Sequence, residues 1–314
     1  MRSLFLHIGQ PYARNDELRA CFSRNRLALL RAGIRFPRHL HPREVETTTS
    51  FAPVQSRFGT AAARWATALG MMGEDDVLVS SPFFLTRMGG PGFADELTAF
   101  ARTAGFDRVS VLMVIREPFE HLAEMYLHDI RHAGSTQRFA EAGAVFDMPA
   151  QALRVMERHP EPLFDVRVVN YRNVADAEPK VIADWLGIEG DQLRAPKITT
   201  ERALTAAEAM FQRALNAQYG SSADILINEL YAATPDLLPD PPRLSSADAI
   251  ALHERLRPTM AALNQQIDPA QAYDLSPPSP EACQQPAPTE RGEVTVSREH
   301  LQQIAAHLAH KVRL

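Results

Sequence analysis

Short apolar runs alternate with amphipathic segments through the first 200 residues, and this alternation limits the fold more than any other feature of the chain. Five runs have the character of buried strands, at 4–8, 34–37, 76–81, 109–115 and 166–170. Five segments have helical spacing, at 16–33, 61–72, 93–104, 119–131 and 174–186. Strands and helices in this order predict an α/β fold with a central parallel sheet covered on both faces.

After residue 200 the strand-like runs stop, and only helical patterns remain. Helices are expected at 203–217, 222–233 and 246–266. The sequence therefore predicts an α/β core over 1–200 and a helical C-terminal part of the same domain over 201–273.

The end of the chain divides into a linker and a helix. Prolines recur among polar residues in 274–292, which is typical of a linker. Ser297 is placed to cap a helix within 293–314, and Leu301 and Ile304 lie on one face of that helix. We expect this helix either to dock on the body of the protein or to mediate self-association.

The net charge of −5 argues against a general nucleic-acid binder, because neutralising phosphates requires a basic surface. No apolar run approaches the roughly 18 residues of a membrane-spanning helix. The cysteines, Cys21 and Cys283, make neither a disulfide framework nor a metal-binding set. We therefore expect a globular cytoplasmic protein that has no membrane span and binds neither nucleic acid nor a metal.

Lysine is nearly absent from the chain, since Lys180, Lys197 and Lys311 are the only three among 33 cationic residues. No lysine precedes residue 180, which excludes any mechanism that needs an ammonium near the N-terminus, such as a Walker-type phosphate lysine. Arginine supplies charge and bidentate recognition but cannot act as a compact point charge. Phosphate recognition near the N-terminus would therefore depend on arginine.

Four short motifs occur in a distinctive order between residues 3 and 275. They are His7-Ile-Gly-Gln-Pro11, Arg116-Glu-Pro118, Asn170-Tyr-Arg172 with Trp185-Leu-Gly-Ile188, and a late helix ending near Asn264 with Tyr273 after it. In order and spacing they resemble the bacterial P-loop sulfotransferase family, in its carbohydrate-type branch. The resemblance implies a three-layer core with a helical C-terminal region. It also implies sulfuryl transfer from 3′-phosphoadenosine 5′-phosphosulfate to a glycan or another hydroxylated acceptor.

The resemblance places the cradle for the donor's phosphosulfate at the loop after the first strand. The cradle positions are Gly9, Gln10, Pro11, Tyr12, Arg14 and Asn15. In the family a lysine, a turn glycine and hydroxyl residues follow the Gly-x-Pro, whereas this chain has Tyr12, Ala13, Arg14, Asn15 and Asp16. Asp16 is a good helix cap, but its charge repels a phosphate from the same N–H groups. Donor binding here would require Arg14 to replace the lysine.

The remaining family positions are partly kept. Arg116 stands where the family's 3′-phosphate arginine stands, but Glu124 occupies the place of a serine. A carboxylate beside a phosphate weakens binding unless it is neutralised, and the alternative is that Glu124 pairs with Arg116. Pro82 replaces the glutamate that resembles the acceptor base in this branch. The candidate substitutes for this base are His7, His39 and His41.

Two other patterns have plainer interpretations. His128 and His132 have the spacing of a metal-chelating pair, with His121 on the same predicted helix, but no acidic or cysteine ligand completes a zinc set. An exposed helix face is therefore expected. The Gly-Gly-Pro-Gly segment at 89–92 either covers a site at the strand ends or is a turn.

The sequence supports two hypotheses for function. Loss of the cradle lysine, the hydroxyls and the base indicates a divergent or non-catalytic protein with a sulfotransferase fold. The alternative is an active sulfotransferase that holds the phosphosulfate donor with Arg14 and Arg116. The candidate catalytic residues are Arg14, His39 and His41.

Overall fold

The computed structural model describes residues 1–13, 15–37, 73–82, 84–159, 162–173, 178–189, 192–195, 203–220, 240–279 and 283. The chain divides into two compact units. One unit contains 1–117, 147–198 and 258–275, and the other contains 118–146, 199–257 and 276–314. The predicted helices at 61–72, 222–233 and 293–314, and most of the predicted linker, lie outside the described residues.

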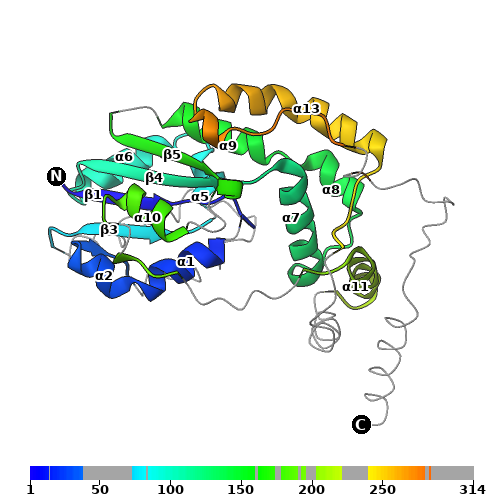
Figure 1. The fold of residues 1–314 in the computed structure, drawn as a ribbon, viewed down its shortest axis with the longest axis horizontal. Coiled ribbons are helices and arrows are strands. Elements are labelled where there is room, and N and C mark those ends of the chain that lie inside the picture. The colour runs from blue at the N-terminus through cyan, green and yellow to red at the C-terminus, as the bar shows by residue number, and fades with distance from the viewer. Residues whose placement is uncertain are drawn as a thin grey trace, which may run out of the picture. The chain divides into compact units, whose positions relative to one another are not determined.

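The first unit is built on a parallel sheet (Figure 1). Its described strands form a five-stranded sheet in the order β2-β3-β1-β4-β5, and every pair is parallel. The strands are β1 Ser3–His7, β2 Ile34–Arg35, β3 Asp76–Ser80, β4 Arg108–Ile115 and β5 Phe164–Asn170. The predicted α/β class with a central parallel sheet is confirmed.

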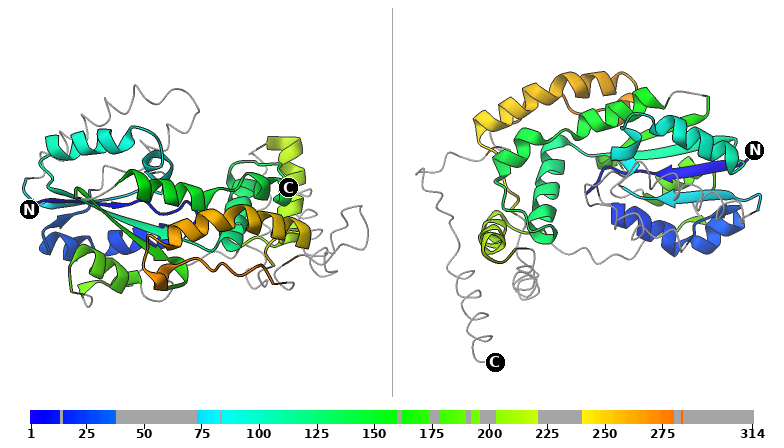
Figure 2. Two further views of the ribbon diagram at one scale, coloured as in Figure 1. Left: turned by 90° about the horizontal axis from the view of Figure 1, so that it is seen from above. Right: turned by 180° about the vertical axis from the view of Figure 1, so that it is seen from behind.

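Helices cover both faces of this sheet (Figure 2). On one face lie α1 Asn15–Arg24, α2 Arg26–Arg31 and α10 Glu178–Leu186, and on the other lie α5 Phe84–Met88, α6 Phe93–Thr103 and α9 Met148–Arg158. Phe5 of β1, Phe22 of α1 and Trp185 of α10 belong to the core of the first face, where the Phe5 and Trp185 ring centroids are 5.4 Å apart. Trp185 also donates a hydrogen bond to Ser110 of β4 at 3.1 Å, so α10 is fixed to the sheet by packing and by a polar contact.

The helix predicted at 16–33 is two helices, and Asn25 is the reason for the break. Its side-chain Nδ2 donates to Cys21 O and to Arg194 O, both at 2.8 Å, and its Oδ1 accepts from Arg194 N at 2.8 Å. The backbone of Asn25 has φ −97° and ψ 12° between α1 and α2. Asparagine side chains that bond to backbone groups compete with helix continuation, and here they also anchor the 192–195 segment.

Several helices were not predicted. The short α5, α8 Phe139–Val145 and α9 occupy stretches where no helical periodicity was recognised. Pro149 in the first turn of α9 and Gly143 within α8 weaken the pattern. Burial against neighbouring elements, rather than local propensity, stabilises such helices.

The second unit is helical where it is described. It contains α7 Pro118–His132, α8, α11 Ala206–Tyr219 and the first part of α13 Ser246–Asn264. Tyr126, Leu127 and Ile130 of α7 pack against Ala209 of α11. Asn216 of α11 donates to Ile130 O at 2.7 Å, which joins the same two helices. In neither unit does a helix among the described residues have the length and hydropathy of a membrane span.

Candidate functional site

The topology of the sheet brings two of the predicted site segments to one place. From β1 the chain moves to β2 and β3 on one side, and it then crosses to β4 and β5 on the other. The carboxyl ends of β1 and β4 therefore flank the switch point, where open α/β sheets bind ligands. The loop at 8–13 follows β1, and Arg116 follows β4 directly.

The backbone N–H groups of the loop after β1 are largely used within the protein. Ile8 N donates to Leu112 O at 3.0 Å, and Gln10 N donates to Val114 O at 2.9 Å. Ala13 N donates to Gln10 O at 3.1 Å. A phosphate cradle requires such N–H groups to point at the ligand, and these three do not.

Tyr12 holds an unusual backbone conformation in this loop. The Ala13–Gln10 hydrogen bond closes a turn with Pro11 and Tyr12 at its centre, and Tyr12 has φ +66°. Among the described residues it is the one non-glycine residue with positive φ. A proline followed by a positive-φ residue is the type II pattern, which normally has glycine in the second place. The loop therefore carries backbone strain at the switch point.

Replacing Tyr12 by glycine and by alanine isolates this strain. Both changes remove the ring, so the two variants differ mainly in the cost of positive φ. We expect Tyr12→Gly to be more stable than Tyr12→Ala by about 1 kcal/mol, measured by urea denaturation.

The matched pair of controls is Leu27→Gly and Leu27→Ala at an exposed site in α2. There the order should reverse by a similar amount, because glycine is unfavourable in a helix. Equal stability of the two Tyr12 variants would contradict a strained turn.

The side chain of Gln10 makes hydrogen bonds to three separate segments of the first unit. It is 0% exposed. Nε2 donates to Met148 O and contacts Tyr273 Oη, both at 3.3 Å, while Oε1 accepts from Arg116 N at 3.2 Å. Gln10 thus links the β1 loop, the end of β4, the start of α9 and the segment after α13.

Arg116 and Glu117, which follow β4, contact different residues at the carboxyl end of β5. The Arg116 guanidinium carbon lies 5.3 Å from the centroid of the Tyr171 ring. Glu117 is buried, and its Oε1 accepts from Asn170 Nδ2 at 3.0 Å and lies 3.6 Å from Arg172 Nη1. The motifs at 116–118 and 170–172, which are far apart in sequence, are therefore adjacent.

Burial raises the pKa of Glu117 above its ordinary value, and the hydrogen bond from Asn170 and the charge of Arg172 oppose that effect only in part. Such a carboxyl group at a strand end is a candidate functional group. The sequence prediction did not single out Glu117. The signal that was present is its place directly after Arg116, in a motif that ends a buried strand.

His7 and two serines form a buried polar cluster where β1 and β3 end. His7 Nδ1 is 2.8 Å from Ser80 Oγ, while His7 Nε2 and Ser81 Oγ are buried without a hydrogen-bond partner among the described residues. Burial, assisted by the charge of Arg19, lowers the pKa of His7 to about 3. A base this weak accepts a proton poorly at neutral pH, so His7 is unsuited to replace the missing acceptor base.

The remaining predicted site residues are Arg14, Asn15, His39, His41 and Glu124. Arg14, His39 and His41 lie outside the described residues, as do the side chains of Asn15 and Asp16. Glu124 is half-buried on α7, in the second unit.

The histidines of α7 lie on that same helix. The rings of His128 and His132 have centroids 4.7 Å apart. No cluster of three potential metal ligands occurs in the part of the chain that the structure describes.

The Gly-Gly-Pro-Gly segment joins α5 to α6. A Cβ at Gly89 would lie 3.5 Å from Gln151 O of α9, and Arg158 of α9 donates a hydrogen bond to Gly89 O. Gly92 has φ +77° and is the N-cap of α6. The positive φ of Gly92 at the N-cap accounts for that glycine, whereas a Cβ at Gly89 would make only ordinary contacts.

Comparison with known proteins gives one structural similarity. No protein-family model matches the sequence, and no curated protein matches it. Among solved structures, a sulfotransferase from Alicyclobacillus acidocaldarius is 17% identical, with a TM-score of 0.41, and the similarity covers 76% of this chain and 98% of that one. The functional assignment therefore rests on the residues of this chain.

Proposed function

We propose that this chain is a divergent, non-catalytic protein with a P-loop sulfotransferase-like core. The observation that carries the proposal is the loop after β1, whose N–H groups at Ile8, Gln10 and Ala13 donate to the chain's own carbonyls. Sulfuryl transfer depends on stabilising charge at the transferred group and at its leaving oxygen, and this loop offers neither the lysine nor those N–H groups.

The residues present do not fit the donor, 3′-phosphoadenosine 5′-phosphosulfate. Pro82 follows β3 where the resemblance calls for an acceptor base, and the nearby His7 is held neutral. Glu124 replaces the serine that would contact the 3′-phosphate. Losses at the cradle, the phosphate site and the base together support a protein that keeps the architecture without the transfer chemistry.

One observation favours the second candidate, an active sulfotransferase. Arg116 lies at the switch point with its guanidinium beside the face of Tyr171, and its backbone is fixed by Gln10. A positioned arginine at this edge suits an anion. Under this alternative Arg116 and Arg14 would hold the donor, and a glycan or another hydroxylated small molecule would be the acceptor.

Isothermal titration calorimetry with adenosine 3′,5′-bisphosphate separates the two candidates. We expect no binding to the wild-type chain at millimolar ligand, because the loop has no lysine and the N–H groups of Ile8, Gln10 and Ala13 donate to the chain's own carbonyls. Micromolar binding that is abolished by Arg116→Ala would overturn the proposal and support the active enzyme.

The control variant is Arg102→Ala, which removes an exposed guanidinium from α6 in the same unit. Binding that both variants weaken equally reflects net positive charge rather than a site at Arg116. That result would leave the active-enzyme alternative without support.

A further inference from the structure

Strand β5 is the last described strand on its side of the sheet. Along the middle of its outer edge, no described residue makes a backbone hydrogen bond to it. On the inner side, Val109 N donates to Leu163 O at 2.9 Å, and at the end of the strand Asn170 N donates outward to Gln271 Oε1 at 2.8 Å. Successive residues of a strand direct their backbone N–H and C=O groups alternately to one neighbouring strand and to the opposite side, so the residues between Leu163 and Asn170 face inward and outward in turn. The outward-facing backbone groups belong to Phe164, Val166 and Val168.

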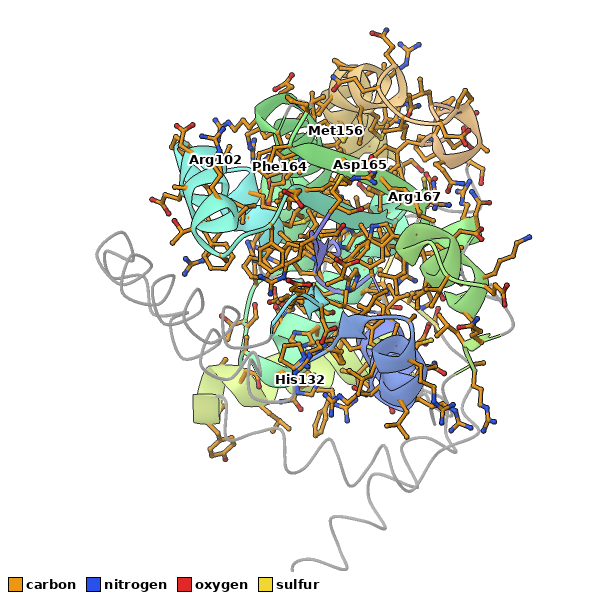
Figure 3. All side chains as sticks on the ribbon, turned by 90° about the vertical axis from the view of Figure 1, so that its left-hand side faces the viewer. Arg102, His132, Met156, Phe164, Asp165 and Arg167 are labelled. Carbon is orange, nitrogen blue, oxygen red and sulfur yellow. The ribbon has the colours of Figure 1, made fainter. Side chains whose placement is uncertain are left out.

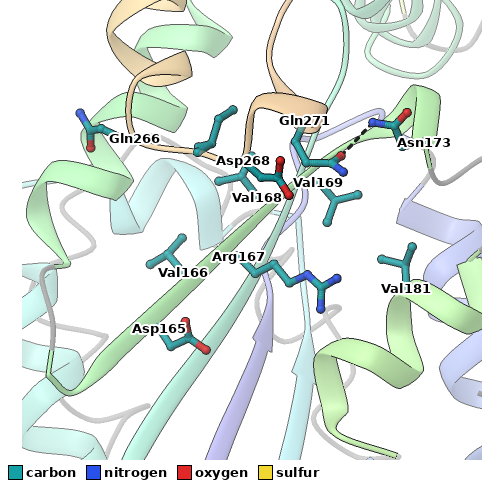
Figure 4. Close-up of a pocket in the computed structure, with 11 residues that line it drawn as sticks. Asp165, Val166, Arg167, Val168, Val169, Asn173, Val181, Gln266, Asp268 and Gln271 are labelled. Carbon is teal, nitrogen blue, oxygen red and sulfur yellow. Dashed lines mark hydrogen bonds between the residues drawn. The ribbon is translucent and has the colours of Figure 1, made fainter. Parts of the chain in front are cut away.

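A hollow of about 440 Å³ follows this edge (Figure 4). Its floor is Asp165–Val169 of β5, and its walls include Val181 of α10 and Gln266–Asp268 after α13. Gln271 closes one end, where it also accepts from Asn173 Nδ2 at 3.0 Å. Gln271 therefore bounds the hollow beyond Val168, which favours a short added strand over a long one.

The side chains on one face of β5 carry opposite charges. Asp165 and Arg167 extend to the same side of the strand, away from Val166 and Val168 (Figure 4). Figure 3 marks Asp165 and Arg167 among all the side chains. The Asp165 side chain is 46% exposed and pairs with Arg108 of β4, while Arg167 is exposed. An acid and a base two residues apart are self-complementary in an antiparallel pair, because each faces its opposite in the other strand.

We propose that β5 pairs antiparallel with β5 of a second copy of this chain, about a twofold axis at Val166. This register places outward-facing groups opposite each other, Val166 against Val166 and Phe164 against Val168. Asp165 then lies opposite Arg167 at positions without backbone hydrogen bonds, where cross-strand side chains are closest. The pairing joins two sheets into one continuous sheet and gives partners to the outward-facing backbone groups of β5.

Charge selects this register over its neighbours. An axis at Asp165 would put two aspartates opposite each other, and an axis at Arg167 would put two arginines opposite each other. Like charges directly opposite in a sheet are destabilising. A pairing over Phe164–Val168 alone is smaller than a standard stable interface, so the dimer is expected to dissociate on dilution.

Sedimentation equilibrium of the full chain with charge reversals tests the proposal. Asp165→Arg and Arg167→Asp should each raise the dimer dissociation constant by roughly tenfold or more, because twofold symmetry alters two pairs at once. The double variant should return it close to the wild-type value. The double variant also lacks the Asp165–Arg108 ion pair within each chain. A dissociation constant that returns to the wild-type value would therefore report the pairs between chains. Thermal melts of each variant check that the fold is kept.

Three results would each overturn the pairing. They are a wild-type chain that stays monomeric at millimolar concentration, a dimer that neither reversal weakens, and a dimer that the double variant fails to restore.

Disulfide trapping is an independent test. Residues paired through backbone hydrogen bonds across an antiparallel axis have Cα atoms about 5.5 Å apart, within the range of a disulfide. Val166→Cys should therefore form a covalent dimer when copper phenanthroline oxidises its thiols, while the buried Cys21 and Cys283 stay reduced. Val145→Cys, 70% exposed on α8, should cross-link much more slowly. Equal rates for the two variants would contradict an axis at Val166.

Discussion

Acidification should destabilise this protein strongly through the buried side chain of His7. His7 is 0% exposed, and burial lowers its pKa from 6.5 to about 3. The unfolded chain therefore binds a proton at this site between pH 6.5 and 3 that the folded chain does not, and stability is lost as pH falls through that window. We expect His7 to contribute a loss of about 3 kcal/mol between pH 6.5 and 4, a large share of the stability of an ordinary domain.

Urea denaturation at several pH values, followed by circular dichroism, measures this effect. His7→Gln has no titrating group and keeps an amide that can meet Ser80, so its stability should depend less steeply on pH in this range. The control is His128→Gln, whose histidine side chain is 43% exposed, and it should retain the wild-type slope. A wild-type slope in His7→Gln would assign the acid sensitivity to other groups. His159 is the next to replace, because burial lowers its pKa as well.

Loss of the Gln10 amide should be the most damaging change at the switch point. Gln10→Leu keeps the volume of the side chain but leaves Arg116 N, Met148 O and Tyr273 Oη without the bonds that Gln10 makes. Buried polar groups without partners cost about 1–3 kcal/mol each. We expect Gln10→Leu to lower the free energy of unfolding by about 3 kcal/mol in urea denaturation.

Two further variants test this interpretation of Gln10. Gln192→Leu changes an exposed glutamine in the same unit and should have little effect. Tyr273→Phe removes one partner of Gln10, so its cost and that of Gln10→Leu should add to more than the cost of the double variant. A loss of unfolding free energy below about 1 kcal/mol in Gln10→Leu would indicate that water forms hydrogen bonds with the groups that Gln10 leaves unpaired.

The strands β1, β3 and β4 are predictable from sequence because each contains a short apolar run, whereas Asp165 hides the start of β5 and β2 is only Ile34–Arg35. Val109–Ile115 is apolar enough to be recognised alone, and Gly33 and Gly105 mark the ends of helical segments, each with positive φ. The short α5 and α8 lack such signals, because tertiary burial rather than periodicity stabilises them. The break at Asn25 depends on Arg194, which no local pattern reveals.

The contacts of the candidate site could not be predicted from sequence. The loop at 8–13 and Arg116 follow β1 and β4 at the switch point, and their part in binding a donor stays a prediction. The roles of Gln10 and Glu117 depend on partners at Tyr273 and Asn170, more than 50 residues away in each case. Sequence spacing cannot give the burial that lowers the pKa of His7 and raises that of Glu117.

The path of the chain through the two units constrains how the protein is made. The side-chain amide of Asn264 donates to Tyr273 O at 2.9 Å and accepts from Tyr273 N at 2.8 Å, and the Tyr273 hydroxyl contacts Gln10, which follows the first strand to be synthesised. The first unit therefore lacks its closing segment until residues 258–275 have left the ribosome. A chain that ends before residue 258 lacks the segment that contacts Gln10. Because each unit is built from three separate stretches of sequence, no single cut in the gene yields either unit intact.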